Sequence, residues 1–414
     1  MKTAKRLLFF LLFGGILALT PISHASADSG RYFIKTTNGF WKNALGVRHE
    51  FDNGFTADLS DFDVHFAQVF GIETESVGVL HILPALESAQ LSDKIATPPA
   101  SPKIGGVKIL KKGVRHIPTE QISWGIKMIY DNPAISSTSG GFDVKVAVLD
   151  TGVNFAHPDL VSRMAQCKDF TNLRFPVLDN KCDDKNGHGT HVAGIVAADS
   201  GKDHLGIYGV APAAKILGYK VCDANGSCYA DDIAAGLRRA VDEGANIINM
   251  SFGTDKDIPT IHDAVNYAFS KGVLMVAAAG NDGPFTDSID YPGAYSSVIA
   301  VSALDKAFVV TDWSSRGINS QTVQYVVENR DIEFAAPGKG IESTWNNGGY
   351  AILSGTSMAS PFVAGLAAKY WQSTASSSAD ATRDLLHSLA TDIAPIGDDN
   401  ISGFGLPQVK FITP

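Results

Sequence analysis

The sequence predicts an α/β protein, with a central parallel sheet covered by helices and a small α+β domain in front of it. The sheet is predicted from short, continuous apolar runs, which are typical of buried strands. These runs are VKVAVLD, AKILGYKV, ANIINMSFG, GVLMVAAAGN and SSVIAVSAL, all between residues 144 and 304. Helix-like segments alternate with them, for example at residues 229–244 and 260–272. Buried strands that alternate with amphipathic helices indicate a parallel sheet with both faces covered.

The first 27 residues have the features of a signal peptide. Lys2, Lys5 and Arg6 form a positively charged start, residues 7–19 are apolar, and SHASA supplies the small residues of a cleavage site at Ala27. A membrane anchor is the competing interpretation, but the apolar run is short for a span and helix breakers follow it. We therefore expect a secreted protein, extracellular or periplasmic in transit, with no membrane association once the signal is removed.

The rest of the chain divides into three segments. Residues 28–95 alternate the β-rich runs RYFIKTT and VGVLHIL with TADLSDFDVHFAQVF, which has a helical pattern, and they predict the small α+β domain. Residues 96–118 combine proline, glycine and basic residues and predict an exposed linker. Residues 119–414 contain the alternating strands and helices. A length of 414 residues fits two or three domains, or one large α/β domain with an accessory domain.

Charge and cysteine content limit the partners and the compartment. The net charge of −9 argues against nucleic acid or an anionic membrane as a partner. In an exported chain the four cysteines predict two local disulfides, Cys167–Cys182 and Cys222–Cys228. Four cysteines allow three pairings, and the sequence leaves the other two open. A zinc site is the rival interpretation, although neither spacing matches one.

Three polar residues stand at strand ends or helix starts, where open parallel sheets bind their ligands. Asp150 closes a strand too apolar to be exposed, and His188 and Ser357 each begin a predicted helix. A serine hydroxyl needs a base to remove its proton, a neutral imidazole can do so near pH 7, and a carboxylate stabilises the resulting imidazolium. Taken singly, the three residues also fit a turn former, a loop or cap residue and a helix N-cap. Taken together, they predict a catalytic triad.

Pro361 restricts where the helix after Ser354 begins. Proline is tolerated in the first turn of a helix, where its missing N–H has no partner to lose. The stretch SGTSMASPFVAG therefore predicts a helix that begins near Ser357. The positive end of that helix favours negative charge beside the serine.

Four sequence blocks resemble those of the subtilisin-like serine proteases (subtilases, peptidase family S8). VLDTGVNFAHPDL, NGHGTHVAGIVAA and SGTSMASPFVAGLAA resemble the three active-site blocks in the family's order, and AAAGNDGP resembles the oxyanion-hole block. The resemblance runs from about residue 119 to GFGLPQV near the C-terminus and implies a three-layer subtilisin-like fold. It implies that Ser357 is the nucleophile, His188 the general base and acid, Asp150 the orienting carboxylate, and Asn281 an oxyanion donor together with the Ser357 N–H.

Two of these residues have alternative interpretations. Asn281 also fits a Gly-Asn turn. His188 and His191 lie three residues apart on one side of a helix and fit an H-x-x-H metal pair, but no glutamate follows His188 as in a zinc-protease HExxH motif.

The resemblance also implies how substrate binds. An extended peptide is expected to add as a strand between two edge segments, so that main-chain hydrogen bonds supply affinity. The residues that match these segments are Asn225, Gly226 and Ser227 on one side and Ser251, Phe252 and Gly253 on the other.

The P1 pocket carries an unusual residue. Its walls match Ala279, Gly280 and the second edge segment, and its floor matches Asp290, just before Tyr291-Pro292. A carboxylate at the bottom of an apolar slot favours Lys or Arg at P1. The same preference suits a chain that cuts its own linker, because the linker contains Lys111, Lys112 and Arg115. The alternative is that Asp290 points to solvent.

Residues 28–95, and especially RYFIKT and HEFDNGFTADL, resemble the inhibitor-type prosegment of the family. This resemblance implies a propeptide that acts as intramolecular chaperone and temporary inhibitor, and a mature start between residues 113 and 119. The resemblance further implies structural calcium, with Asp159 as an acidic ligand and other ligands from the Asp199–Gly206 loop. Asp199 and Asp203 fit solvated loop charges equally well.

These expectations describe a secreted serine endopeptidase made as a self-processing zymogen. We expect a monomer whose partners are protein substrates and its own propeptide. The alternative is a catalytically inactive binding protein on the same scaffold, which the presence of Asp150, His188, Ser357 and Asn281 disfavours. A metal-dependent hydrolase would instead fail with a chelator.

Overall fold

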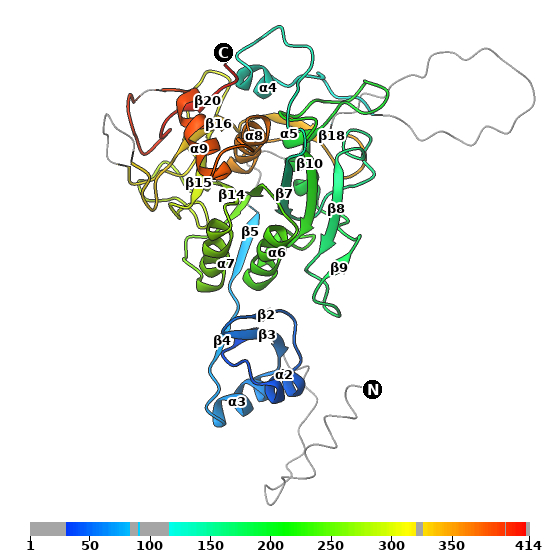
Figure 1. The fold of residues 1–414 in the computed structure, drawn as a ribbon, viewed down its shortest axis with the longest axis vertical. Helices are drawn as coiled ribbons and strands as arrows, with labels where there is room; N and C mark the ends of the chain where they lie inside the picture. Colours follow the sequence, from blue (N-terminus) through cyan, green and yellow to red (C-terminus); the bar gives the residue numbers. More distant parts are fainter. Residues whose placement is uncertain (1–29, 83–89, 92–115, 320–325, 394, 411–414) are drawn as a thin grey trace, which may run out of the picture. The chain divides into compact units, whose positions relative to one another are not determined.

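A computed structural model describes residues 30–82, 90–91, 116–319, 326–393 and 395–410 (Figure 1). The predicted signal peptide and nearly all of the predicted linker lie outside the described residues. The chain forms two compact units. The first contains the residues up to Gly78 and Leu173–Pro176, and the second contains Val79–Asn172 and Val177–Pro414. Within the described ranges, no helix is both long enough and apolar enough to cross a membrane.

From Gly30 onwards, where the structure describes it, the first unit is a four-stranded antiparallel sheet with two helices. The strand order is β2-β3-β1-β4, and the core includes Trp41, Phe55 and Leu59. TADLSDFDVHFAQVF, predicted as a helix, is helical only in its second part, because Ser60 caps a helix that begins at Asp61 and the residues before it pair with β1. The elements are β1 (Gly30–Ile34), α2 (Gly39–Leu45), β2 (Glu50–Phe51), β3 (Gly54–Leu59), α3 (Asp61–Val69) and β4 (Thr74–Ser76).

The second unit is built on an eight-stranded sheet, which confirms the predicted α/β class. The strand order is β16-β15-β14-β12-β7-β10-β8-β9, and every neighbouring pair is parallel except β8 with β9. The strands are β7 (Lys145–Asp150), β8 (Met164–Asp169), β9 (Leu178–Asp179), β10 (Lys215–Lys220), β12 (Ile247–Met250), β14 (Leu274–Ala278), β15 (Val298–Leu304) and β16 (Phe334–Pro337).

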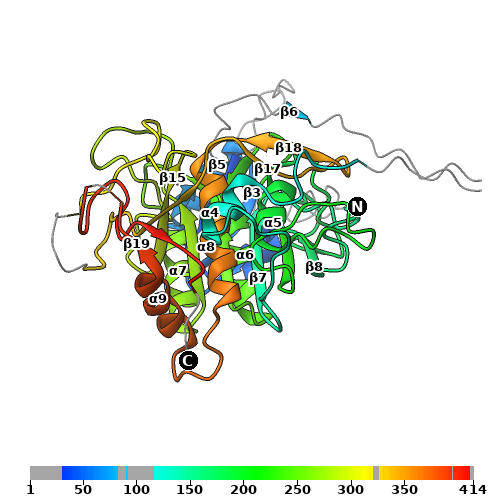
Figure 2. The same ribbon diagram turned by 90° about the horizontal axis from the view of Figure 1, so that it is seen from above.

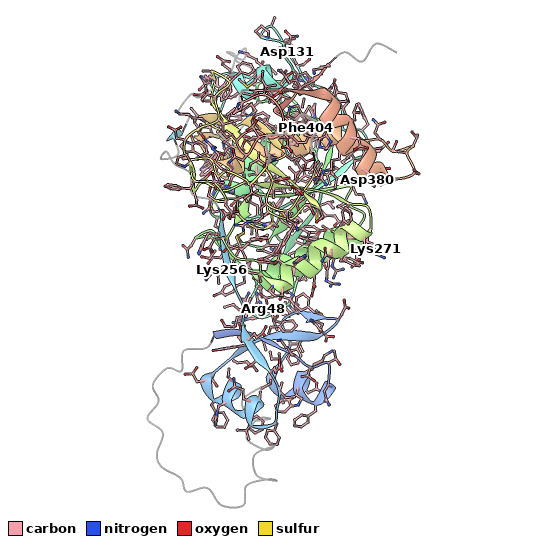
Figure 3. The ribbon with its side chains drawn as sticks, turned by 90° about the vertical axis from the view of Figure 1, so that its left-hand side faces the viewer. Arg48, Asp131, Lys256, Lys271, Asp380 and Phe404 are labelled. Carbon is pink, nitrogen blue, oxygen red and sulfur yellow. A yellow bond between two sulfur atoms is a disulfide. The ribbon has the colours of Figure 1, made fainter. Side chains whose placement is uncertain are left out.

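Helices cover both faces of this sheet. On one face α5 (His188–Ala197) packs against α8 (Thr356–Lys369), and on the other α6 (Ala230–Asp242) packs against α7 (Pro259–Ser270) (Figures 1 and 2). The side chains of β7, β10, β12, β14, β15 and β16 are almost all buried, as continuous apolar strands require, whereas those of β8 and β9 are partly exposed. Charged residues such as Lys271, at the end of α7, and Asp380, in α9 (Ser378–Leu389), lie at the surface (Figure 3).

The described part of the second unit also contains three small sheets and the short helix α4 (Trp124–Ile129). β5 (Val79–Ile82) lies between β11 (Ser227–Tyr229) and β13 (Phe252–Gly253), so most of the VGVLHIL run pairs in this unit, whereas its first residue, Val77, bonds to Arg31 of β1. The remaining elements are β17 (Ile341–Thr344) with β18 (Tyr350–Leu353) and β6 (Gln90–Leu91), and β19 (Ala390–Thr391) with β20 (Leu406–Pro407).

The parallel register brings several strand ends to one edge. Asp150 at the end of β7 is paired with Lys220 at the end of β10, and Leu149 is paired with Met250 at the end of β12. The polar segments that follow these strands therefore meet at the carboxyl edge of the sheet, where such folds bind ligands.

Candidate active site

A buried carboxylate ends β7. Asp150 is the last residue of the strand and has no exposed surface. Its Oδ1 accepts a 2.6 Å hydrogen bond from the Thr151 N–H. Its backbone oxygen accepts hydrogen bonds from the N–H groups of Val221 (2.9 Å) and Cys222 (3.1 Å), beyond the end of β10. The neighbouring strand therefore fixes the position of Asp150.

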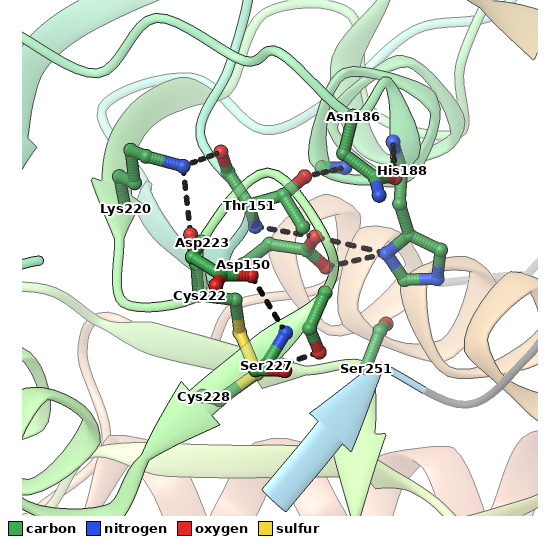
Figure 4. Close-up of a disulfide and its surroundings, with 12 residues drawn as sticks. Asp150, Thr151, Asn186, His188, Lys220, Cys222, Asp223, Ser227, Cys228 and Ser251 are labelled. Atoms are coloured by element: carbon green, nitrogen blue, oxygen red, sulfur yellow. Dashed lines mark hydrogen bonds and ion pairs between the residues drawn. A yellow bond between two sulfur atoms is a disulfide. The ribbon is translucent and has the colours of Figure 1, made fainter. Parts of the chain in front are cut away.

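His188 is the first residue of α5, and its ring faces Asp150 (Figure 4). Nδ1 lies 2.8 Å from Asp150 Oδ1 and 3.0 Å from Oδ2. Burial lowers the pKa of His188, but the charge and hydrogen bond of Asp150, helped by the charge of Asp184, outweigh burial and leave the pKa raised. Nε2 is buried and has no hydrogen-bond partner among the described residues. With the Nδ1 proton directed at Asp150, Nε2 keeps a lone pair that can accept a proton.

Asp184 is a site residue that the sequence motifs did not single out. The N-cap of α5 is Gly187, which has no side chain to cap the helix, and Asp184 supplies the acceptors in its place. Its two oxygens accept hydrogen bonds from Gly187 N (2.7 Å), Thr190 N (2.9 Å) and Thr151 Oγ1 (2.9 Å). Asp184 thus ties the start of the His188 helix to the residue after Asp150. An acidic residue just ahead of a glycine-capped helix was the available signal.

Ser357 is a buried residue in the first turn of α8. Its Oγ donates a 3.0 Å hydrogen bond to the Ser251 carbonyl oxygen, beyond the end of β12, and not to His188. Ser251 Oγ in turn donates a 3.0 Å hydrogen bond to the Ser357 carbonyl oxygen. The structure therefore holds the serine hydroxyl against the second predicted edge segment.

Pro361 lies in the second turn of α8, whereas the sequence predicts that it lies in the first. The helix begins at Thr356, so the prediction of its start is correct to within one residue. A proline at position 361 removes the N–H that would bond to the Ser357 carbonyl. The Ser251 hydroxyl takes the place of that N–H, so the carbonyl keeps a donor and the helix tolerates the proline.

Asn281 follows β14 and faces the start of α8. Its Oδ1 accepts hydrogen bonds from both the N–H and the hydroxyl of Thr356, each 3.0 Å long. Its Nδ2 lies 3.4 Å from the position that a Cβ would take at Gly355, and Ser357 N lies 3.8 Å from the same point. The Asn281 amide and the Ser357 N–H therefore border one small space. Thr356 orients the Asn281 amide, and the sequence motifs did not single out this residue.

A strand of the chain itself occupies the space between the two predicted edge segments. β5 pairs antiparallel with both, Ser227 lying opposite His81 and Phe252 opposite Ile82. Gly226 O accepts a 2.9 Å hydrogen bond from Ile82 N, and Gly253 pairs with His81. The N–H of Asn225 instead donates to Asp223 within its own turn. Both segments can therefore bind an extended peptide by strand addition.

Asp290 lies close to Gly253 and Gly280, two residues of the predicted pocket walls. It is only 3% exposed, and its N–H bonds to the Ala279 carbonyl oxygen at 2.8 Å. Its Oδ2 lies 2.7 Å from the position of a Cβ at Gly253 and 2.7 Å from that at Gly280. The carboxylate therefore lies between Gly253 and Gly280. A larger residue at either position would place its Cβ too close to Oδ2. Burial, followed by the charges of Asp282 and Asp255, raises the pKa of Asp290 to about 7.

The surroundings of Asp159 fit a calcium ion. Asp159 has no exposed surface, and its Oδ2 accepts hydrogen bonds from Ile207 N (2.9 Å) and Tyr350 OH (2.7 Å). The carbonyl oxygens of His204 and Gly206 converge on the side-chain amide of Gln121, at 2.6 and 3.2 Å.

The loop around Asp159 also presents a polar atom that its own residues do not satisfy. The Oγ of Ser200 is buried without a hydrogen-bond partner among the described residues. Carboxylate, carbonyl and hydroxyl oxygens are the donors that Ca²⁺ prefers. Asp199, by contrast, is bonded to Ser162 and lies 3.0 Å from the Arg163 guanidinium.

His191 faces away from Asp150. Its Nε2 bonds to the carbonyl oxygens of Ile341 and Ala351, at 3.0 and 3.1 Å, whereas His188 faces Asp150. Burial, followed by the charge of His188, lowers the pKa of His191 to about 3. The H-x-x-H metal alternative therefore fails on geometry, because the two side chains bond in different directions.

The structure contains both cysteine pairs proposed from the sequence, Cys167–Cys182 and Cys222–Cys228, with Cα atoms 5.2 and 4.0 Å apart. The second pair closes the turn that leads into β11, beside the Asp150–His188 pair (Figure 4).

Comparisons of sequence and of structure with known proteins agree on one protein family. The sequence pattern of the subtilase family matches residues 141–405. A subtilisin from Bacillus sp. (strain TA39) is 42% identical, over 89% of this chain and 87% of its own, and Subtilisin Savinase from Lederbergia lenta is 37% identical, over 71% and 99%. The solved structure of Sphericase superposes with a TM-score of 0.68 at 50% identity, over 70% of this chain and 99% of its own. The chain therefore belongs to the subtilase family and is a subtilisin-like serine endopeptidase.

Proposed function

We propose that Asp150, His188 and Ser357 form the catalytic triad of this endopeptidase and that Asn281 and the Ser357 N–H form its oxyanion hole. The observation that carries the proposal is the buried Asp150–His188 hydrogen bond, which leaves Nε2 without a partner among the described residues at the edge of the sheet. The peptide site beside it supports the proposal, since β5 already lies there as an extended strand.

The proposed reaction proceeds in two stages. The Ser357 hydroxyl turns from the Ser251 carbonyl and attacks the scissile carbonyl carbon, while His188 Nε2 takes the hydroxyl proton. The oxyanion that forms is stabilised by the Asn281 Nδ2 and Ser357 N–H groups. His188 then gives the proton to the leaving amine, and the acyl-enzyme remains. A water molecule, deprotonated by His188, hydrolyses the acyl-enzyme and frees Ser357.

A fluorophosphonate probe tests the triad. We expect the mature protein to be labelled at Ser357, because only an activated serine attacks the probe. Ser357→Ala should abolish labelling and should also leave residues 28–118 attached to the chain, since self-processing needs the same nucleophile. The measurement is intact-protein and peptide mass spectrometry. A wild-type chain that stays unlabelled when folded would favour the inactive binding protein.

We further propose that the chain is exported and made as a zymogen. Residues 1–27 have the pattern of a signal peptide, and residues 28–95 act as chaperone and temporary inhibitor. The position of β5 supports this role, because a strand held between β11 and β13 occupies the place that a substrate peptide would take. The working enzyme is a monomer that acts on proteins.

Calcium is proposed as a structural cofactor, held by Asp159 and the oxygen atoms of the Ser200–Gly206 loop. A bound ion stabilises the folded state by an amount that grows with the logarithm of the ratio of its free concentration to Kd. We expect EDTA to lower Tm by roughly 10 °C, since saturating ligand contributes about 3–4 kcal/mol. Excess Ca²⁺ should restore Tm, as measured by calorimetry of an inhibited sample.

Asp159→Asn is the matched variant for the calcium prediction. It keeps the shape of the side chain and removes the charge, so its Tm should be low and should not respond to EDTA. Asp203→Asn, in the same loop, is the control and should keep the response. An EDTA effect that persists unchanged in Asp159→Asn would place the ion elsewhere.

A further inference from the structure

A lysine ammonium group lies buried behind Asp150. Lys220, the last residue of β10, is only 7% exposed. Its Nζ donates two hydrogen bonds of 2.7 Å, one to the carbonyl oxygen of Thr151 and one to that of Cys222 (Figure 4). Thr151 follows the catalytic carboxylate, and Cys222 opens the disulfide-closed turn that contains the first edge segment. One ammonium group therefore bonds both to the turn after Asp150 and to the turn that begins at Cys222.

The charges around Lys220 come from four different segments. They are Asp169 at the end of β8, Asp184 ahead of α5, Asp223 after β10 and Asp150 at the end of β7. Burial lowers the pKa of Lys220, and these four carboxylates oppose that shift and favour the ammonium form. No carboxylate of the described residues forms a direct ion pair with it. Main-chain carbonyls are its hydrogen-bond acceptors, so its position depends on the backbone of the site.

We propose that Lys220 is a positioning residue of the active site, which ties the Asp150–Thr151 turn to the first edge segment and whose charge keeps the His188 imidazole neutral enough to act as a base. This inference depends on the proposed triad.

The first part of the inference follows from shared backbone contacts. The Asp150 carbonyl oxygen already accepts hydrogen bonds from Val221 and Cys222, and Lys220 adds a second connection between the same two segments. Without the ammonium, two carbonyl oxygens at the centre of the site lose a donor. The carboxylate that orients His188 then loses part of its support, and small displacements of catalytic groups reduce rates strongly.

The second part follows from the charges that act on His188. Asp150 and Asp184 both favour the imidazolium form, and His191, on the same helix, is neutral because of its low pKa. A general base must be neutral when substrate arrives. Lys220 lies on the other side of Asp150 from His188 (Figure 4), and Asp150 is one of the carboxylates whose charges act on Lys220. Its positive charge offsets the two carboxylates, and its removal should make His188 easier to protonate.

The test is the pH dependence of kcat/KM for Lys220→Met. We expect the acid limb to move up by on the order of one pH unit. We also expect kcat to fall roughly tenfold on the plateau above the acid limb, because positioning is lost. Lys220→Arg keeps the charge and should keep the acid limb of the wild type. Lys215→Met is the matched control, since it removes an exposed lysine from the other end of β10 and should change neither quantity.

The outcomes separate this inference from the triad itself. Rates are divided by the concentration of fluorophosphonate-reactive sites. A variant that folds poorly is therefore not mistaken for a folded variant with a low kcat. If Lys220→Met yields no reactive sites, Lys220→Gln is measured in its place, and the same upward shift is expected. An acid limb unchanged in the neutral variant overturns the role of the charge, and an unchanged kcat on the plateau above the acid limb overturns the positioning role. A folded wild type that does not react with the probe overturns the triad proposal instead.

Discussion

Asp150→Asn is expected to lower kcat by about 10⁴-fold without unfolding the protein. An asparagine amide in this position donates to His188 Nδ1, so the imidazole must carry its proton on Nε2 and can no longer accept one from Ser357. The same change in serine proteases of another fold has an effect of this size, and we expect it here because the chemistry of the Asp–His pair is the same. Steady-state kinetics at pH 8 measure the effect.

A second Asp–His pair supplies the control for this variant. His262 Nδ1 lies 3.3 Å from Asp257 Oδ2, and both side chains are partly exposed on the surface. Asp257→Asn makes the same chemical change and should leave kcat within about twofold of the wild type, as surface changes generally do. A loss of less than about tenfold in Asp150→Asn would show that Asp150 does not orient the base.

Asp290→Asn is expected to reverse the preference for the P1 residue. We propose that Asp290 pairs with Lys or Arg at P1, because its carboxylate is buried between Gly253 and Gly280. Removing one member of a buried ion pair costs about 3 kcal/mol or more, so kcat/KM for Arg peptides should fall about 100-fold. The value for Phe peptides should stay level or rise. Equal use of Phe and Arg by the wild type would contradict the proposal.

The pH dependence of this preference has a defined sign. The pKa of Asp290 is raised to about 7, mainly by burial, so the carboxylate that attracts Arg is present above pH 7 and protonated below it. The ratio of kcat/KM for Arg and Phe peptides should therefore rise roughly tenfold from pH 6 to pH 8. The ratio cancels the titration of His188, which acts on both substrates. The rise should vanish in Asp290→Asn and persist in Asp287→Asn, which changes an exposed aspartate of the same loop.

Local sequence predicted the elements well where the pattern was regular. The apolar runs are strands of the large sheet, and the helix after Ser354 begins within one residue of its prediction. The errors have tertiary causes. Pro361 lies deeper in α8 than local rules allow because Ser251, far away in the chain, donates to the carbonyl that proline leaves without its N–H. The VGVLHIL run is a strand as predicted, but most of it pairs within the second unit.

The residues missed by sequence reasoning share one property. Asp184, Thr356 and Lys220 do their work through backbone groups or through a neighbour, so no pairing of residue types marks them in the sequence. Their partners are settled by which strand and helix ends meet at the carboxyl edge of the sheet. Asp290 differs from them, because the sequence singled it out before Tyr291-Pro292 and left only the direction of its side chain open.

The order of residues alone determined the α/β class, the family and the identity of the groups that can carry the chemistry, because strand and helix periodicity and the active-site blocks are local patterns. Only the tertiary structure decided that Asp150 lies within hydrogen-bond reach of His188, that the Asp290 carboxylate lies between two glycines, and that a lysine holds two carbonyl oxygens. The physical reason is that these contacts join residues far apart in the chain, and their energies depend on burial and distance, which parallel strand register creates.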